Sequence, residues 1–180
     1  FRSPSKAKNA PSAFEDGRKV TDAICQWLHL GFAYGPVEES EVPKHAKFNG
    51  IMTRPKPTGA ARIILNLSSP EGSSVNDGID SSEFPTSMSS TAHWLRALNS
   101  CGRGCLMVKI DWSDAYKHVA VRKEDLKLQW FSWLGKAFCE LCLIFGSKSS
   151  VGIYDRLAKL VLKIVCSKSG MPEGMVCQHL

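Results

Sequence analysis

The 180-residue sequence has no long hydrophobic run and no even set of cysteines. No stretch approaches the roughly 18 consecutive apolar residues of a membrane-spanning helix, so we expect no membrane partner. The seven cysteines are an odd number, which does not suit a framework of paired disulfides. Because they are scattered among apolar residues, we predict mostly buried thiols in a reducing, intracellular compartment, and no signal chooses between cytoplasm and nucleus.

The sequence also lacks internal repeats and a strong excess of one charge. Its composition, with 43% hydrophobic and 22% charged residues, is that of an ordinary folded domain. A chain of this length can bury roughly two thirds of its unfolded surface, so we expect a single domain with a core. The net charge of +6 permits a polyanionic partner but does not by itself indicate one.

The first half of the chain begins with a polar segment and then shows helical spacing. Residues 1–13 are rich in Ser, Pro, Lys and Ala, so we predict a flexible tail there. Val20, Ile24 and Leu28 then recur at the spacing of one helical face, and Gly31 can end that helix.

Further along, prolines between residues 32 and 59 favour extended or looping backbone. The aliphatic run 62–67 predicts a strand, and a polar loop follows over 68–90. The hydroxyl groups of residues 89–91 can cap a second helix that runs to 101–102.

The second half alternates predicted strands and helices. The order strand, helix, hairpin, helix, strand is close to the split βαβ pattern, in which helices cover one face of an antiparallel sheet. We therefore predict an α+β fold. The predicted elements are a strand over 105–110, a turn or helical segment through 116, a hairpin of strands 126–133 and 137–144 joined at 134–136, a helix from 149–150 to 170, and a strand beginning at 175.

Asp111 follows directly after the first of these strands, where a cation or phosphate can approach the sheet edge. By position alone, an aspartate that caps the next turn is the better explanation. The surrounding sequence says more, since residues 108–116 (VKIDWSDAY) resemble the first palm motif of reverse transcriptases. Residues 56–68 (KPTGAARIILNLS) resemble the fingers segment of the same enzymes, and residues 143–150 (LIFGSKSS) resemble their second palm motif.

These three motifs occur in the order of the family. The resemblance covers about residues 20–180 and is to RNA-directed DNA polymerases of retrotransposons, in particular those of tyrosine-recombinase elements. It implies a right-hand polymerase fold over 14–180, with fingers over about 14–100 and part of the palm over about 101–180.

The resemblance also assigns roles around Asp111. It makes Asp111 the catalytic carboxylate and a ligand of both Mg²⁺ (or Mn²⁺) ions of a two-metal mechanism, with the backbone carbonyl of Trp112 as a further ligand. The backbone amides of Asp114 and Ala115 would face the nucleoside triphosphate. Tyr116 would lie beneath the sugar and exclude a ribose 2′-hydroxyl, which implies selection of deoxynucleotides. Without the motif, Asp114 reads as a helix cap and Tyr116 as a core residue.

Four more residues are implied to bind the nucleotide. Arg62 matches the fingers arginine that grips the triphosphate, because a guanidinium can bind phosphate through two hydrogen bonds. Lys56 would supply a second charge. Gly146 suits a place where backbone passes close to the nucleotide, and Phe145 would line the pocket. The alternatives are two surface cations for Arg62 and Lys56 and a turn glycine for Gly146.

The cysteine spacing offers a zinc site as a competing interpretation. Cys139 and Cys142 have the spacing of half a zinc site, and Cys101 with Cys105 could supply the other half. In a strand, however, alternation points Cys139 and Cys142 to opposite faces, which argues against shared metal binding. Basic residues after the first palm motif form either a solvated face or a nucleic-acid track; they are Lys117, Arg122, Lys123 and Lys127.

The third palm motif of the family, Tyr-x-Asp-Asp, is absent, since no two aspartates are adjacent. Residues 176–180 resemble the strand that leads into that catalytic hairpin, so we expect the sequence to be a fragment truncated before it. One carboxylate cannot easily hold two divalent ions against their mutual repulsion. We therefore expect Mg²⁺ to bind only with the missing carboxylates, and this chain alone to be inactive.

Two further interpretations compete with the leading one. The leading one is a reverse transcriptase fragment whose partners are an RNA or DNA template with its primer and deoxynucleoside triphosphates. The second is a non-catalytic retroelement relic that binds nucleic acid through charge, with salt-dependent affinity. The third is a small zinc-binding domain. The sequence does not indicate an oligomeric state.

Overall fold

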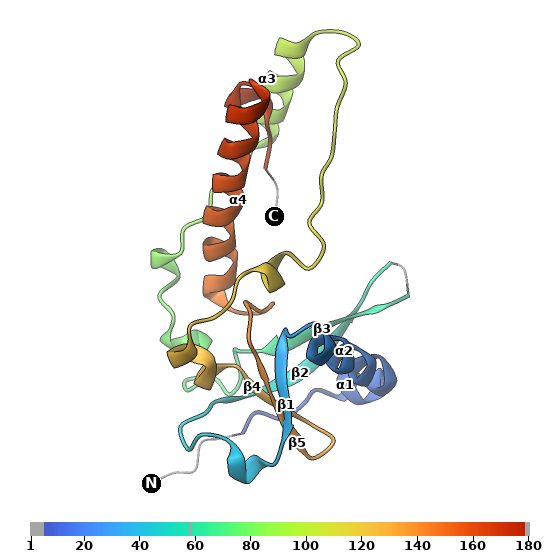
Figure 1. Ribbon diagram of the computed structural model, residues 1–180, viewed down its shortest axis with the longest axis vertical. Coiled ribbons are helices and arrows are strands. Elements are labelled where there is room, and N and C mark those ends of the chain that lie inside the picture. Colours follow the sequence, from blue (N-terminus) through green and yellow to red (C-terminus); the bar gives the residue numbers. More distant parts are fainter. Residues whose placement is uncertain (1–5, 58, 179–180) are drawn as a thin grey trace. The chain divides into compact units, whose positions relative to one another are not determined.

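The computed structural model describes residues 6–57 and 59–178. The chain divides into two compact units, each made of two separate segments (Figure 1). We call them the sheet unit, Phe1–Asp80 with Tyr116–Ser150, and the helical unit, Ser81–Ala115 with Val151–Leu180. This division differs from the linear one at about residue 100 that the sequence suggested for fingers and palm, and the latter stays a prediction.

The sheet unit contains a five-stranded mixed sheet in the order β1-β5-β4-β2-β3. The fold is therefore α+β as predicted, but the sheet is not wholly antiparallel, because β2 and β4 run parallel. A long crossover connection separates these two strands along the chain, and parallel pairing requires such a connection. The strands are β1 (Ala33–Val37), β2 (Phe48–Pro55), β3 (Ala61–Asn66), β4 (Trp130–Trp133) and β5 (Lys136–Glu140).

Two helices, α1 (Pro11–Glu15) and α2 (Gly17–His29), pack on this sheet. Val20 and Ile24 of α2 are buried against Ile51 of β2 and Phe131 of β4. The helix predicted from the apolar spacing is confirmed, because that spacing places one face of α2 on the core.

The N-terminal segment differs from the predicted tail. Residues 1–5 lie outside the described residues, but from Lys6 onward the chain packs along β2. The backbone N–H of Ala7 donates to Phe48, that of Ala10 donates to Ile51, and Ala13 is fully buried. Polar composition did not predict this, because backbone pairing with β2 and small alanine side chains need no apolar periodicity.

Two hairpins shape the sheet. β2 and β3 are antiparallel and joined by a turn that contains Lys56 and Gly59, although Thr58 within it lies outside the described residues. β4 and β5 are joined at Leu134 and Gly135, whose φ angles of 48° and 79° suit a tight hairpin turn. This confirms the one hairpin that the sequence predicted. Its first strand is shorter than predicted, because Lys123–Leu128 forms a 3-10 helix.

The helical unit contains α3 (Thr91–Cys101) and most of α4 (Lys148–Ser169). The hydroxyl of Ser90 accepts the backbone N–H of His93 and caps α3, as the sequence predicted. Gly170, at φ 70°, follows the last residue of α4 and confirms its predicted end.

Two predicted strands are absent from the part of the helical unit that is described. Residues 105–110 have no regular structure and run as an extended trace, with Leu106 97% exposed (Figure 1). The strand predicted from 175 is instead a 3-10 helix, Glu173–Met175, followed by irregular backbone to 178, and residues 179–180 lie outside the description. A strand requires a hydrogen-bonding neighbour, which apolar sequence alone does not supply.

The cysteines are less buried than predicted. Cys139, Cys142 and Cys166 are buried, but Cys25, Cys101 and Cys105 are exposed and Cys177 is intermediate. The exposed thiols lie on α2, at the end of α3 and in the extended trace, where no sheet covers them. Within residues 6–57 and 59–178, no helix has both the length and the apolar composition of a membrane span.

Candidate functional site

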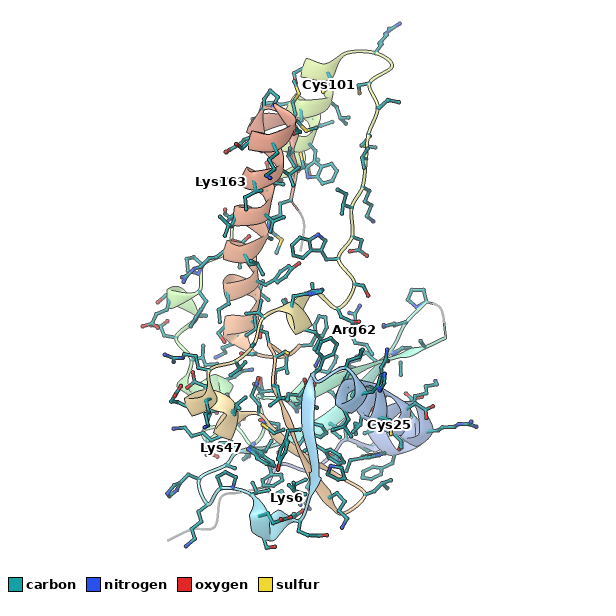
Figure 2. All side chains as sticks on the ribbon, in the orientation of Figure 1. Lys6, Cys25, Lys47, Arg62, Cys101 and Lys163 are labelled. Atoms are coloured by element: carbon teal, nitrogen blue, oxygen red, sulfur yellow. The ribbon has the colours of Figure 1, made fainter. Side chains whose placement is uncertain are left out.

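Three predicted site residues of the sheet unit form one cluster, which we call the arginine–aromatic cluster: Arg62, Tyr116 and Phe145. Arg62 lies on β3 (Figure 2), and its Cζ is 5.4 Å from the centroid of the Phe145 ring. On the same phenylalanine, the ring of Tyr116 packs at a centroid distance of 4.8 Å and an angle of 56°. The fold thus brings together side chains that lie far apart in the sequence.

Gly146 completes this cluster for a steric reason. Its φ is 103°, and a Cβ at this position would lie 2.5 Å from the backbone oxygen of Leu65 on β3. Only glycine allows so close a passage of the two backbones. The close approach brings Phe145, the preceding residue, to the strand that carries Arg62.

Asn76 holds the Gly146 turn in place. Its Nδ2 donates to the Gly146 carbonyl at 2.7 Å and to the Ser68 hydroxyl at 2.9 Å, and its Oδ1 accepts the backbone N–H of Lys148 at 3.0 Å. The side chain is buried, so these bonds satisfy groups that would otherwise be costly to bury. Sequence reasoning missed Asn76, because it lies in a polar loop where an asparagine is unremarkable.

The cluster combines a cation with an aromatic wall. A guanidinium that stacks on an aromatic face keeps its in-plane N–H donors available for an anionic oxygen. Arg62 is exposed, while burial raises the pKa of Tyr116, so its phenol is neutral at physiological pH. This arrangement can bind a phosphate beside an apolar ring surface.

Lys56 lies in the exposed turn after β2, beyond the paired strands that carry Arg62. The structure places another cation nearer to Arg62, since Arg54 is its direct partner across β2 and β3. Two like charges at directly opposed positions repel each other, and an anion between them would relieve that repulsion. The register of the hairpin, which the sequence did not specify, is the signal that identifies Arg54.

The other predicted site residues belong to the helical unit. Asp111 is exposed in the irregular segment after residue 105, not at the end of a strand as predicted. Trp112 packs edge-on against Tyr154 of α4 at 5.9 Å. Asp114 has φ 50°, a conformation that aspartate tolerates better than most residues, and Ala115 begins the 3-10 helix Ala115–His118.

The described residues do not make up a magnesium site. No three His, Cys, Asp or Glu side chains among residues 6–57 and 59–178 gather at distances that could hold a metal ion. Asp111 offers one carboxylate, whereas Mg²⁺ requires octahedral oxygen coordination. The same geometric finding covers zinc, since neither cysteine pair belongs to such a group among the described residues. Burial raises the pKa of Cys139 to about 12 and also raises that of Cys142.

Lys117 departs from both predicted roles, a solvated face and a nucleic-acid track. Its ammonium forms an ion pair with Glu140 and lies 4.4 Å from the centroid of the Trp27 ring. Both charged side chains are almost fully buried. Arg122 forms an exposed pair with Asp125 at 2.8 Å, which suits a solvated face.

Comparison with known proteins gives a likeness in structure alone. No protein-family model matches the chain, and no curated protein matches it. The protease–reverse transcriptase of prototype foamy virus, as a selenomethionine-labelled mutant, is similar with a TM-score of 0.61 and 18% identity over 91% of this chain. Foamy viral protease–reverse transcriptases crystallised with double-stranded DNA and with an RNA/DNA hybrid are similar with TM-scores of 0.57 and 0.58 and identities of 20% and 17%, each over 91% of this chain.

This chain spans only part of those proteins, namely 20%, 25% and 19% of their respective lengths. At such low identity the likeness concerns the fold and carries no residue roles with it. It agrees with the α+β elements and the mixed five-stranded sheet described above. The chain has a reverse-transcriptase-like fold.

Proposed function

We propose that this chain forms the nucleotide-binding part of an RNA-directed DNA polymerase of a retrotransposon. The observation that carries the proposal is the arginine–aromatic cluster, which joins Arg62, Tyr116 and Phe145 on one side of the Gly146 turn. The reverse-transcriptase-like fold supports it, and two of the similar proteins were crystallised with nucleic-acid duplexes. In the complete protein, the reaction is template-directed transfer of deoxynucleotides to a primer.

Each member of the cluster has a role in this proposal. Arg62 binds the triphosphate of the incoming nucleotide through the edge of its guanidinium, while Phe145 stacks on its face. Tyr116 forms the surface beneath the sugar, where its ring leaves no room for a 2′-hydroxyl. In the helical unit, the backbone amides of Asp114 and Ala115 are proposed to face the triphosphate. The fingers and part of the palm are the polymerase subdomains to which we propose that this chain corresponds.

Asp111 is the proposed catalytic carboxylate and, with the Trp112 carbonyl, a proposed metal ligand. The described residues do not supply the further carboxylates that Mg²⁺ or Mn²⁺ needs, so we propose no catalytic step for this chain by itself. The isolated chain is expected not to extend a primer on an RNA template. Primer extension by this chain that disappears in Asp111→Asn would contradict that expectation.

Nucleotide binding tests the proposal directly. The affinity of the chain for a fluorescent deoxynucleoside triphosphate, measured by anisotropy, should fall about tenfold or more in Arg62→Ala, because a charge-assisted hydrogen bond is lost. Arg18→Ala is the matched control, since Arg18 is an exposed arginine on α2 within the same unit. Its affinity should equal that of the unmodified chain.

Equal affinities of Arg62→Ala and Arg18→Ala would contradict the proposal, as would no binding by the unmodified chain. If the chain does not bind deoxynucleotides but binds a duplex with an affinity that depends strongly on salt, it would instead be a non-catalytic nucleic-acid-binding module. Phosphate contacts alone produce such salt dependence through counterion release.

A further inference from the structure

We propose that Lys117 and Glu140 are positioning residues for Tyr116, and that their buried ion pair holds the Tyr116 ring against Phe145. The inference concerns a pair of residues outside the arginine–aromatic cluster. It rests on the proposed function only for its consequence, which is selection of the sugar of the incoming nucleotide. The positioning itself is a property of the sheet unit and can be measured without any nucleotide.

The first observation is where the pair lies. Lys117 directly follows Tyr116 in the 3-10 helix Ala115–His118, and Glu140 is the last residue of β5. The ion pair therefore ties the short helix that carries Tyr116 to the central sheet. Trp27 of α2 lies over the same ammonium, so the tether reaches a second element of the core.

The second observation is the backbone next to the pair. The N–H of Val121 donates to Leu141 at 2.9 Å, and the N–H of Leu143 donates to Val119 at 2.9 Å. The segment after Tyr116 thus runs beside the segment that leads from Glu140 to Phe145. These backbone bonds fix the far end of the Tyr116 segment, and the ion pair fixes the near end. Both rings of the stack are held by the same two neighbouring segments.

The third observation is that the pair is costly to bury. Side-chain exposure is 10% for Lys117 and 2% for Glu140, and burial raises the pKa of Glu140 while Lys117 opposes the rise. Buried ion pairs contribute little net stability compared with apolar residues of similar volume, and in some proteins they instead specify one arrangement. The arrangement specified here is the position of the Tyr116 ring against Phe145.

A fluorine label on tyrosine can measure this arrangement. The sequence has three tyrosines, so the chain prepared with 3-fluorotyrosine should give three ¹⁹F resonances, and Tyr116→Phe identifies one of them. That resonance senses the ring of Phe145, whereas Tyr34 and Tyr154 lie elsewhere and serve as internal controls. A general loss of structure would move all three signals.

The variants separate positioning from folding. Lys117→Met leaves Glu140 buried without its cation, so Lys117→Met combined with Glu140→Leu provides a second form in which apolar packing replaces the pair. In both, the Tyr116 resonance should shift while those of Tyr34 and Tyr154 stay in place. Lys117→Arg retains a cation opposite Glu140 and should leave the Tyr116 resonance where it lies in the unmodified chain. An unmoved Tyr116 resonance in the folded double variant overturns the proposal.

A nucleotide measurement then tests the consequence. The affinity ratio of dUTP over UTP, which differ only at the 2′ position, should fall at least fivefold in the double variant and stay unchanged in Lys117→Arg. A ratio unchanged from that of the unmodified chain overturns the role in sugar selection. If the unmodified chain binds neither nucleotide, the proposed function fails, but a Tyr116 resonance that shifts in the double variant and not in Lys117→Arg still supports the positioning role.

Discussion

Two stretches of the chain have a similar aliphatic character and different structures. Residues 62–67 (RIILNL) lie almost wholly in β3, which pairs with β2 over six residue positions. Residues 105–110 (CLMVKI) have no partner strand in the part of the chain that is described, and Val108 and Ile110 are exposed. The comparison teaches that strand propensity describes how well a segment suits a sheet, while a neighbouring strand decides whether it joins one.

The same contrast extends to the two units. The sheet unit has two apolar cores, built around Phe131 and around Trp130. In the helical unit, a group of polar contacts surrounds one buried carboxylate. Asp155 of α4 is 1% exposed and accepts hydrogen bonds from the backbone N–H of Ser87 and from the amide of Gln178, and Ser89 and Gln178 exchange two more bonds.

The largest expected effect comes from replacing a buried isoleucine of the sheet by alanine, and the same change in the exposed 105–110 segment provides the comparison. Ile51→Ala removes a side chain that is 1% exposed and should lower the free energy of unfolding by about 2–5 kcal/mol. Ile110→Ala removes one that is 75% exposed and should change it by less than about 0.5 kcal/mol. Urea denaturation of both variants measures the difference. A cost for Ile110→Ala as large as that for Ile51→Ala would mean that the 105–110 segment is buried in solution.

A smaller effect tests the polar character of the helical unit. Asp155→Ala leaves the amide of Gln178, the N–H of Ser87 and the ammonium of Lys159 without their acceptor, which should cost about 1–3 kcal/mol. Amide hydrogen exchange should become faster at Ser87, Ser89 and Gln178. The matched control is Glu173→Ala, an exposed carboxylate in the same unit. Equal exchange in both variants would show that Asp155 does not anchor these segments.

The smallest expected effect is a change in the pKa of one carboxyl group in the sheet unit. The hydroxyl and N–H of Ser74 donate to Asp77 and lower the pKa of its carboxyl. A lowered pKa contributes stability above the unfolded value, about pH 4, and that stability is lost as the pH falls through the folded pKa. Ser74→Ala should therefore raise the pKa of Asp77 toward its ordinary value, as seen by NMR titration of its carboxyl carbon. No change would mean that the hydroxyl bond is not formed in solution.

Local pattern predicted most of the helices and the hairpin of β4 and β5. The apolar face of α2, the cap at Ser90 and the stop at Gly170 are local signals, and the structure confirms them. The predicted tail differed because its backbone pairs with β2, which is a long-range contact. The predicted strand at 105–110 was wrong. Its apolar pattern is a local signal, whereas a strand forms only where another strand pairs with it.

The candidate site likewise contains residues that the sequence identified and one that it missed. Motif resemblance identified Arg62, Tyr116, Phe145 and Gly146 before any distance was known, and the structure brings them together in the sheet unit. Their assignment to nucleotide binding stays a proposal. Asn76 was missed, because a buried hydrogen-bonding asparagine has the same local sequence context as an exposed one.

By itself, the sequence determined which segments can be helices, where the chain turns, and which motif residues deserve attention, because capping, periodicity and glycine conformation are properties of a few neighbouring residues. Only the tertiary structure decided the parallel pairing of β2 with β4, the burial of Lys117 with Glu140, and the contacts of Phe145 with Arg62 and Tyr116. Those contacts join residues far apart along the chain, and their energies depend on burial and distance, which no local pattern contains.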